Sequence, residues 1–358
     1  MPDELLELRD PDVAFERLEA WLLDRGFFGD GADDLVAEVY LGYGLSNAIR
    51  RDRTTSPVES CPALPLAACR LPSDSLVTDR YKHGFALGGW ERSWEAAEYR
   101  SAIEAVRDAI ARGDVYQVNV VQHLRAPFEG DPRSLVARLA PLRPLHPEPF
   151  VTERWAVVSA SPELFLARRG DRVWTMPIKG TRPRGGSAEL RASAKDAAEH
   201  VMIVDLERND LSRVCRPGTV RWPELMVTEE LAGVEHMVST VEGRLRETVG
   251  LAEILHATFP GGSVTGAPKI AAVDLIAELE PVGRGASMGA IGRIYGNGDF
   301  VLALTIRTFA IAEGSIHLWV GGGIVWDSDP ATEVEESWVK ARPLLHALGS
   351  RLPEAALT

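Results

Sequence analysis

The sequence predicts an α+β fold, with hairpins interspersed among helices rather than regular βαβ alternation. Short apolar runs typical of strands cluster at residues 155–178 and 301–320. Segments with apolar residues at helical spacing, such as residues 93–112, separate these runs. The 358 residues suffice for one large domain or two tightly joined ones.

The first 92 residues carry less pattern than the rest. An amphipathic helix is indicated near residues 15–23, and a loop rich in Ser, Pro and charge spans residues 51–57. Because the patterning sharpens at Ser93, we expect a short N-terminal segment at 1–92 and the main domain at 93–358.

The main domain should begin with a helix that Ser93 caps and that ends at Gly113. A hairpin near the C-terminal end of this domain should turn at Glu313-Gly314. We further expect strands at 115–124, 155–159, 163–167, 172–178, 301–311 and 315–320, and helices at 189–211, 269–280 and 331–348.

Composition excludes several classes of protein. The net charge of −13, without a basic cluster, argues against nucleic acid as a partner. No apolar run reaches the ~20 residues that a membrane span needs, and the acidic start lacks the apolar region of a signal peptide. The cysteines, Cys61, Cys69 and Cys215, are odd in number and lack zinc spacing, which fits the cytoplasm.

Two predicted helices each carry a pair of carboxylates three residues apart, Asp196 with Glu199 and Glu333 with Glu336. Together they could form an oxygen-lined site for one hard cation, and Mg²⁺ suits it best. Two solvated acidic helix faces are the alternative. Lys340 lies four residues after Glu336, a spacing that also suits a surface ion pair.

Two further features could bind an anion. Arg307 interrupts an apolar run; it could bind a carboxylate, or it could form a structural ion pair or take an edge position. The glycines Gly321–Gly323 and the loop 260–269 free backbone N–H groups, although such turns are often only turns. The loop resembles a phosphate-binding loop superficially, because Ala-Pro-Lys follows Gly266.

Three residues could take part in proton transfer or nucleophilic attack. Glu163 starts a strand and His236 lies in the run Glu235–Ser239; either could move protons or be structural. Lys179 lies between an apolar strand end and a glycine, which makes it a candidate nucleophile.

In this order, the motifs resemble those of the chorismate-binding enzymes across residues 93–358. That family comprises anthranilate synthase component I, aminodeoxychorismate synthase component I, isochorismate synthase and salicylate synthase. The matching runs are Gly113–Asn119, Ser159–Glu163, Pro177–Gly185, Asp205–Leu211, His236–Thr240, Pro260–Lys269 and Gly321–Pro330.

The resemblance implies two large β-sheets packed as a sandwich with flanking helices and the active site between them. It implies Glu199 and Glu336 as the principal Mg²⁺ ligands, supported by Asp196 and Glu333, with Lys340 nearby. Chorismate would be bound by Gln117, Gly180, Thr181, Thr265, Arg307, Gly321, Gly322 and Gly323. His236 would contact it, and Glu163 would protonate the departing C4 hydroxyl.

Two positions then select a branch of the family. Water-adding members carry a lysine where this chain has Gln117, and a glutamine amide cannot activate water. Anthranilate synthases carry Ala at the position of Lys179, whereas aminodeoxychorismate synthases carry Lys, which attacks C2 before ammonia adds at C4. The resemblance is therefore closest to the aminodeoxychorismate synthase branch, which supplies 4-aminobenzoate and folate. Such a lysine must be neutral, so we expect the site to lower its pKa.

The resemblance also has departures. Ser287 and Arg293 stand where the family often has aromatic residues, which bears on substrate contacts. No run resembles a glutamine amidotransferase domain, so ammonia is expected from a separate glutaminase subunit or from free ammonium. An anthranilate-type or secondary-metabolic aminating synthase, and a non-catalytic binding subunit, stay as alternatives.

Overall fold

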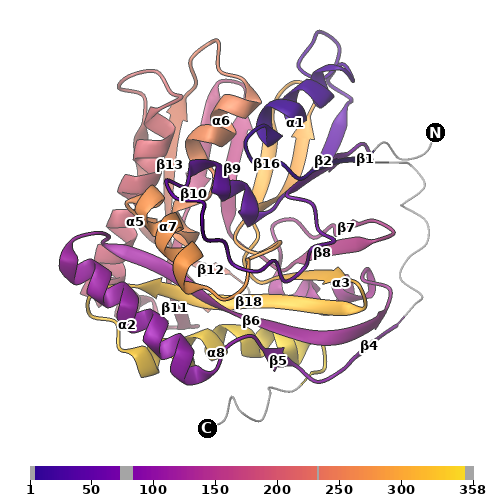
Figure 1. Ribbon diagram of the computed structural model, residues 1–358. Helices are drawn as coiled ribbons and strands as arrows, with labels where there is room; N and C mark the ends of the chain where they lie inside the picture. Colours follow the sequence, from indigo (N-terminus) through magenta and orange to yellow (C-terminus); the bar gives the residue numbers. More distant parts are fainter. Residues whose placement is uncertain (1–4, 73–83, 232–233, 351–358) are drawn as a thin grey trace.

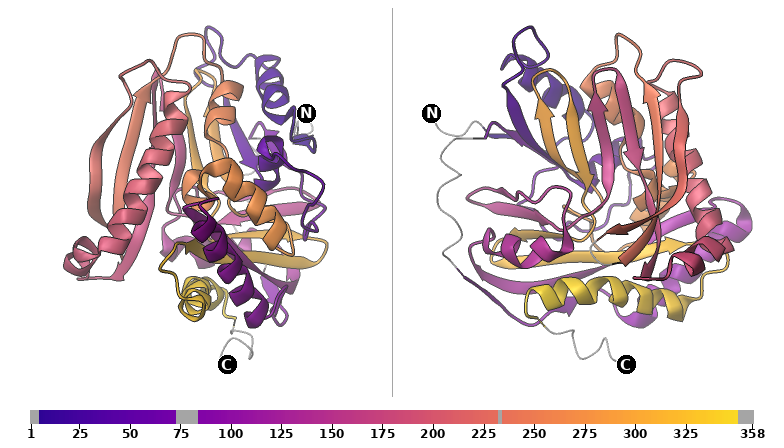
Figure 2. Two further views of the ribbon diagram at one scale, coloured as in Figure 1. Left: turned by 60° about the vertical axis from the view of Figure 1, so that its left-hand side comes forward. Right: turned by 180° about the vertical axis from the view of Figure 1, so that it is seen from behind.

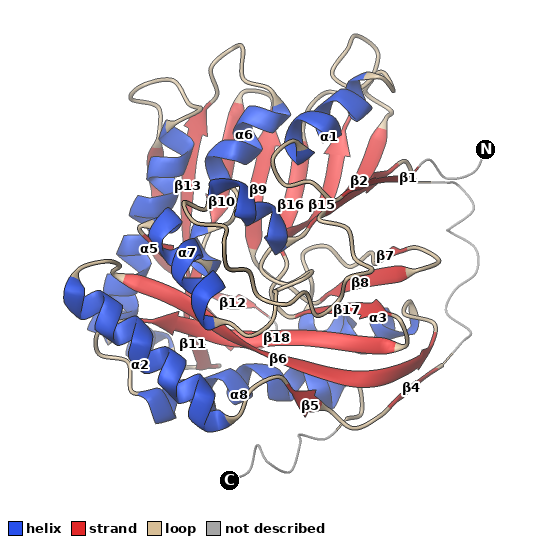
Figure 3. Ribbon diagram, in the orientation of Figure 1, coloured by secondary structure: helices blue, strands red, loops and turns tan. Residues whose placement is uncertain are grey.

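The computed structural model describes residues 5–72, 84–231 and 234–350. Two antiparallel sheets form the framework, and their strands run at a steep angle to each other (Figure 1). The predicted α+β class with two large sheets is confirmed, and helices lie on the outside of this framework (Figure 3).

The first sheet has ten strands. In spatial order they are β1 (Leu5–Leu8), β3 (Ala67–Arg70), β2 (Val36–Leu41), β15 (Ala290–Tyr295), β16 (Phe300–Leu304), β9 (Leu164–Arg169), β10 (Arg172–Met176), β13 (Val234–Arg244) and β11 (Ile178–Pro183). β12 (Arg221–Leu231) also pairs with β13. The N-terminal strands thus share a sheet with strands from the main domain.

The second sheet has eight strands. In order they are β14 (Gly266–Ala267), β6 (Gln117–Gly130), β18 (Ser315–Ile324), β17 (Thr308–Ala312), β8 (Trp155–Ser159) and β7 (Phe150–Val151), while β4 (Phe85–Leu87) and β5 (Glu91–Arg92) pair with β6. The register of β18 sets Gly323 opposite Asn119 and Gly321 opposite Val121. The glycines therefore lie beside the start of β6.

Helices cover both sheets, as the two views of Figure 2 show. The first sheet is flanked by α1 (Ala14–Leu23), α4 (Ser187–Ala192), α5 (Ala194–Ser212) and α6 (Leu251–Thr258). The second sheet is flanked by α2 (Ala96–Arg112), α3 (Ser134–Leu139) and α8 (Pro330–Ala347). α7 (Lys269–Leu279) packs against β6 and β14. Short 3₁₀ turns span Tyr43–Ile49, Ala140–Leu142 and Gly262–Val264.

Two apolar clusters form the core. The larger joins residues of both sheets with α1 and α6, and includes Leu18, Val118, Ile254 and Trp319. The smaller lies between the second sheet and α3 and α8, around Phe309 and Trp338. Burial of this apolar surface holds the two sheets and their helices together.

The chain crosses between the sheets at two adjacent places. β8 in the second sheet leads to β9 in the first through residues 160–163, and β16 in the first leads to β17 in the second through residues 305–307. The two crossings bond to each other, because the Ala160 amide donates to the Arg307 carbonyl and the Leu304 amide to the Glu163 carbonyl, both at 3.0 Å. Glu163 and Arg307 thus lie where the sheets meet.

This crossing corrects one prediction. The expected single strand 301–311 is wrong, because Thr305–Arg307 bends and Arg307 adopts a φ of 51°. Apolar residues on both sides hid the bend. The hairpin at Glu313-Gly314 is confirmed, since β17 pairs with β18.

Three other boundaries differ from the predictions. The helix expected at 189–211 is two helices, because Ser193 leaves helical geometry and its side chain caps α5 by accepting the Asp196 amide. Glu95, not Ser93, caps α2, in a reciprocal capping box with Glu98. The strand 172–178 breaks at Pro177, which separates β10 from β11.

Other expectations are confirmed. β8 spans residues 155–159, α7 and α8 begin and end within one residue of their expected bounds, and Gly113 caps α2 with a φ of 81°. In the part of the chain that is described, no helix combines the length and apolar character needed to cross a membrane.

Candidate active site

Lys179 projects from β11 at the edge of the first sheet. β11 bulges between Lys179 and Thr181 as it runs along β13. Gly180, at the bulge, has a φ of 64°, and a Cβ there would lie 2.5 Å from Leu190 Cδ1 and 3.3 Å from Asp196 Cγ. Only glycine tolerates both the backbone angle and the close helices. The Lys-Gly-Thr run therefore fixes the point at which Lys179 leaves the strand.

The Lys179 side chain is buried, with 12% exposed, and its ammonium has two partners. Nζ lies 3.1 Å from Glu199 Oε1 on α5 and donates to the Ser263 carbonyl at 3.2 Å. Burial acts to lower the pKa of Lys179, but Glu199 and Glu163 outweigh it, so the pKa is raised. In this state the lysine is an ammonium, contrary to the lowered pKa that we expected from the sequence.

Gln117 is buried at the start of β6 and faces the same carboxylate. Its Nε2 donates to Glu199 Oε1 at 3.2 Å. Gly323 on β18 leaves room for this contact, since a Cβ there would collide with the Gln117 amide and lie 2.9 Å from Glu199 Oε1. Lys179, Gln117 and Glu199 are thus brought together.

The acids on α8 face the neighbouring glycine. An added Cβ at Gly322 would lie 3.5 Å from Glu336 Oε1 and 3.6 Å from Glu333 Oε2. Lys340 Nζ lies 2.8 Å from Glu336 Oε1 and donates to the Gly321 carbonyl at 2.9 Å. Lys340 therefore pairs with Glu336 and also anchors the glycine strand.

The remaining members of the two carboxylate pairs have partners of their own. Asp196 Oδ2 lies 2.8 Å from Arg182 on β11. Glu333 Oε1 accepts the Ser328 hydroxyl at 2.7 Å. Within the described residues no three acidic, histidine or cysteine side chains converge as a metal-binding group.

The carboxylates on α5 and α8 are nevertheless the type of ligand that a hard cation prefers. Glu199 approaches Gly323 and Glu336 approaches the adjacent Gly322, so helices α5 and α8 bring carboxylate oxygens to consecutive residues of β18. Oxygen donors of this type suit Mg²⁺. In the described structure Glu199, Glu336 and Asp196 pair with Lys179, Lys340 and Arg182, and Glu333 accepts a hydrogen bond from a hydroxyl.

Glu163 lies at the first crossing between the sheets and is 5% exposed. Burial raises the pKa of Glu163, opposed by Lys179, by the Ser263 hydroxyl, by the Ile178 amide and by Arg307. A carboxyl with a raised pKa holds its proton to higher pH, as a general acid must. Ser263 Oγ donates to Glu163 Oε1 at 2.8 Å.

Arg307 and His236 lie close enough for the charge of Arg307 to act on the imidazole. Burial lowers the pKa of Arg307, and the charge of Glu163 opposes this effect. His236 on β13 is buried opposite Thr181 in the strand ladder and donates to the Gly180 carbonyl. Burial and Arg307 lower the pKa of His236, so its imidazole is neutral near pH 7.

Thr265 differs from the other expected substrate contacts. It is 0% exposed, and its hydroxyl donates to the Gly261 carbonyl at 2.9 Å. The side chain thus closes the 3₁₀ turn Gly262–Val264. Ser263 in this turn touches both Lys179 and Glu163, and sequence reasoning missed it because it read the loop only for its backbone N–H groups.

The chain belongs to the chorismate binding enzyme family, which matches residues 51–346. It is 39% identical over 337 residues to anthranilate synthase component 1 of Streptomyces coelicolor, covering 90% of this chain and 62% of that protein. It is 41% identical over 270 residues to aminodeoxychorismate synthase component 1 of Klebsiella aerogenes, covering 73% of this chain and 60% of that protein. The family match starts at residue 51, earlier than the resemblance found at 93.

Two solved structures share the fold. Anthranilate synthase component I from Streptococcus pneumoniae superposes with a TM-score of 0.81 at 24% identity, covering 91% of this chain and 84% of that one. The menaquinone-specific isochorismate synthase of Escherichia coli gives 0.73 at 19% identity, covering 97% and 86%. The chain spans about three fifths of the length of the curated relatives it matches.

Proposed function

We propose that this chain aminates chorismate at C4 with ammonia, in a Mg²⁺-dependent reaction that yields 4-amino-4-deoxychorismate and water. The observation that carries the proposal is Lys179, a buried lysine whose Nζ lies 3.1 Å from the predicted Mg²⁺ ligand Glu199. A lysine in this position offers a nucleophile that the anthranilate-type reaction does not require.

The substrate would bind to the positively charged and backbone N–H groups of the site. Arg307 would pair with one carboxylate of chorismate, and the Gly321–Gly323 backbone and the Gly180-Thr181 turn would line the rest. His236, neutral and held by the Gly180 carbonyl, would orient the ring. A dianionic substrate needs such partners because its charges are buried on binding.

The first chemical step uses Lys179 and Glu163. The neutral Lys179 amine would form a bond to C2, both ring double bonds would shift by one position, and the C4–O bond would break. Glu163 would give its proton to the leaving hydroxyl, which departs as water. The raised pKa of Glu163 supports this role.

The second step reverses the shift. Ammonia would form a bond to C4, both ring double bonds would shift back, and the C2–Nζ bond would break to release the Lys179 amine. The proton lost by the added nitrogen would return to the Glu163 carboxylate. Chorismate and ammonia are thus converted to aminated product and water, with both residues restored.

Glu199 and Glu336 would hold Mg²⁺, with Asp196 and Glu333 in support. When bound, the cation would neutralise these carboxylates, bind a substrate carboxylate and favour the neutral amine of Lys179. In the arrangement described, Glu199 and Glu163 instead raise the pKa of Lys179 and so favour its ammonium form.

Amination at C2, as in the anthranilate synthases, is the second candidate, because such a relative aligns with 90% of this chain. A non-catalytic role is less well supported, since Glu163, Lys179 and Arg307 surround one site.

We also propose that ammonia comes from a separate glutamine amidotransferase subunit, because relatives are named as component 1. The three free, buried cysteines fit a cytoplasmic location.

The test is product identity. The purified chain is incubated with chorismate, Mg²⁺ and ammonium, and products are separated by liquid chromatography and mass spectrometry. We expect 4-amino-4-deoxychorismate without pyruvate. Anthranilate with an equal amount of pyruvate would favour the C2 reaction, and unconsumed chorismate would favour the non-catalytic role.

A further inference from the structure

We propose that Ser263 is a positioning residue that sets the arrangement of Glu163 and Lys179 relative to each other. The inference rests on the proposed function, because it assigns these residues as acid and nucleophile. Ser263 lies in the 3₁₀ turn Gly262–Val264, between α6 and β14, and its side chain is buried.

Ser263 contacts the two residues through different groups. Its hydroxyl donates to Glu163 Oε1 at 2.8 Å, whereas its carbonyl accepts from Lys179 Nζ at 3.2 Å. One residue thus fixes a carboxyl from the crossing before β9 and an amine from β11. The Glu163 carboxyl also accepts the amide of Ile178, the residue before Lys179.

The turn that carries Ser263 is held in place by contacts from three other residues. The Thr265 hydroxyl donates to the Gly261 carbonyl at 2.9 Å, and Arg284 donates to the Val264 carbonyl at 2.8 Å. Arg284 is buried and paired with Glu280 at 2.7 Å. A Cβ at Gly262 would lie 2.9 Å from Leu206 Cδ2, so α5 packs directly against the turn. Ser263 is therefore presented from a rigid support.

The two contacts have separate consequences. The hydroxyl bond favours the charged form of Glu163, so it limits how far burial raises the pKa of this carboxyl. The carbonyl bond directs the Lys179 amine without altering its covalent chemistry. Ser263 would thereby hold the acid and the nucleophile in the geometry that concerted attack and leaving-group protonation require.

The test is Ser263→Ala, which removes the hydroxyl and keeps the carbonyl. We expect kcat to fall about 10- to 100-fold with KM nearly unchanged, since a misplaced acid impairs the transition state more than binding. The alkaline limb of the kcat profile should move to higher pH, because Glu163 loses a bond that stabilises its charged form. Ser263→Thr should restore most of both properties.

Ser315→Ala is the matched control. Ser315 is also a buried serine in a hydrogen bond, with Arg125, but it lies at the opposite end of β18 from the glycines. Its rate and pH profile should match wild type. An unchanged kcat and pH profile in Ser263→Ala would overturn the inference, as would a failure of Ser263→Thr to restore them.

A second measurement separates this inference from the proposed function. Crystal structures of wild type and Ser263→Ala should differ in the position of the Glu163 carboxyl. If wild type yields no aminated product, the proposed function fails, whatever Ser263 does. If wild type aminates chorismate and Glu163 keeps its position in the variant, only the inference on Ser263 fails.

Discussion

Lys179 and Gln117 bind the same oxygen, Oε1 of Glu199, at 3.1 and 3.2 Å. One residue comes from the first sheet and the other from the second, so Glu199 on α5 joins the sheets at the site. The two positions that we expect to select a branch of the family are therefore in contact with one predicted Mg²⁺ ligand. A change at either should alter both the nucleophile and the metal site.

Lys179→Ala tests the nucleophile. Because no other side chain replaces the amine, we expect C4 amination to fall at least ~100-fold, while amination at C2 becomes the main reaction. Product ratios from chorismate and ammonium, with mass spectrometry of quenched enzyme for an adduct on Lys179, provide the measurement. Undiminished 4-amino-4-deoxychorismate from the variant would show that Lys179 does not attack the ring.

Glu199→Gln and Glu336→Gln test the metal site. Each removes a negative charge from the proposed ligand set, so the Mg²⁺ concentration for half-maximal activity should rise at least ~10- to 100-fold. Titration calorimetry with Mg²⁺ gives a second readout that does not depend on turnover. Glu335→Gln is the control, since Glu335 also lies on α8 but is exposed and pairs with Arg342. Equal Mg²⁺ affinity in all variants would exclude these ligands.

The sequence already singles out most residues of the candidate site, because they lie in short, distinctive runs. The spacing of Glu333 and Glu336 gave a shared helix face, and α8 has it. Arg307 was identified as a buried charge, but its apolar neighbours concealed the crossing between sheets at that residue. A bend of this kind depends on which sheet each half joins, and local periodicity does not contain that information.

Two roles depend on contacts that apolar periodicity does not reveal. Ser263 binds Glu163 across 100 residues, whereas Thr265 turns its hydroxyl back to the nearby Gly261 carbonyl. The sequence also does not predict the raised pKa of Lys179. Burial lowers this pKa as expected, but the nearby Glu199 carboxylate, which only the fold brings close, raises it. Tertiary partners decide these properties.

Lys269→Met tests the buried ion pair between Lys269 and Asp210. Lys269 Nζ lies 2.5 Å from Asp210 Oδ2 and donates to the Thr258 carbonyl at 2.9 Å, with both side chains almost fully buried. Removing the cation leaves Asp210 without its charge partner, so the free energy of unfolding should fall by about 3–5 kcal/mol. Urea unfolding provides the measurement. The double variant Lys269→Met/Asp210→Asn should recover part of the loss, and equal stability of wild type and single variant would contradict the prediction.

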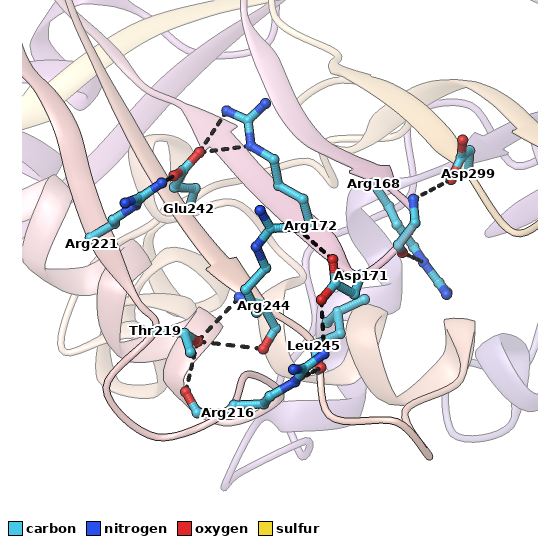
Figure 4. Close-up of polar contacts among 11 residues, drawn as sticks. Arg168, Asp171, Arg172, Arg216, Thr219, Arg221, Glu242, Arg244, Leu245 and Asp299 are labelled. Carbon is cyan, nitrogen blue, oxygen red and sulfur yellow. Dashed lines mark hydrogen bonds and ion pairs between the residues drawn. The ribbon is translucent and has the colours of Figure 1, made fainter.

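Glu242→Gln tests the arginine cluster at the end of β10, β12 and β13 (Figure 4). Glu242 is buried and accepts from Arg172 and Arg221, each at 2.7 Å, while Asp171 pairs similarly with Arg216 and Arg244. Because charge-assisted bonds are lost, we expect the free energy of unfolding to fall by about 1–3 kcal/mol. Glu253→Gln, in the exposed pair with Arg246, should change it by less than ~1 kcal/mol. Similar effects of the two variants would mean that burial adds nothing to the Glu242 contacts.

The stacked, buried pair His123 and His317 should make the protein sensitive to acid. His123 Nε2 lies 3.0 Å from His317 Nδ1, and Ser93 bonds to the other side of His123. Burial lowers the pKa of His123 to about 3, with help from His317 and Arg125, and burial and Arg125 lower the pKa of His317 to about 4. Both imidazoles are therefore neutral in the folded state at pH values where an unfolded histidine is charged.

The sign of the pH effect follows from these pKa values. Below pH ~6.5 the unfolded chain binds protons that the folded pair does not, so the free energy of unfolding falls as the pH drops towards about 4. Replacing one member, as in His317→Gln, should reduce this slope by up to ~1.4 kcal/mol per pH unit, even if the variant is less stable at pH 7. Urea unfolding at pH 7.0, 6.0 and 5.0 measures the slope, and His256→Gln, which removes a more exposed histidine paired with Glu16, is the control. Parallel pH curves for wild type and His317→Gln would show that protonation of this buried histidine does not limit acid stability.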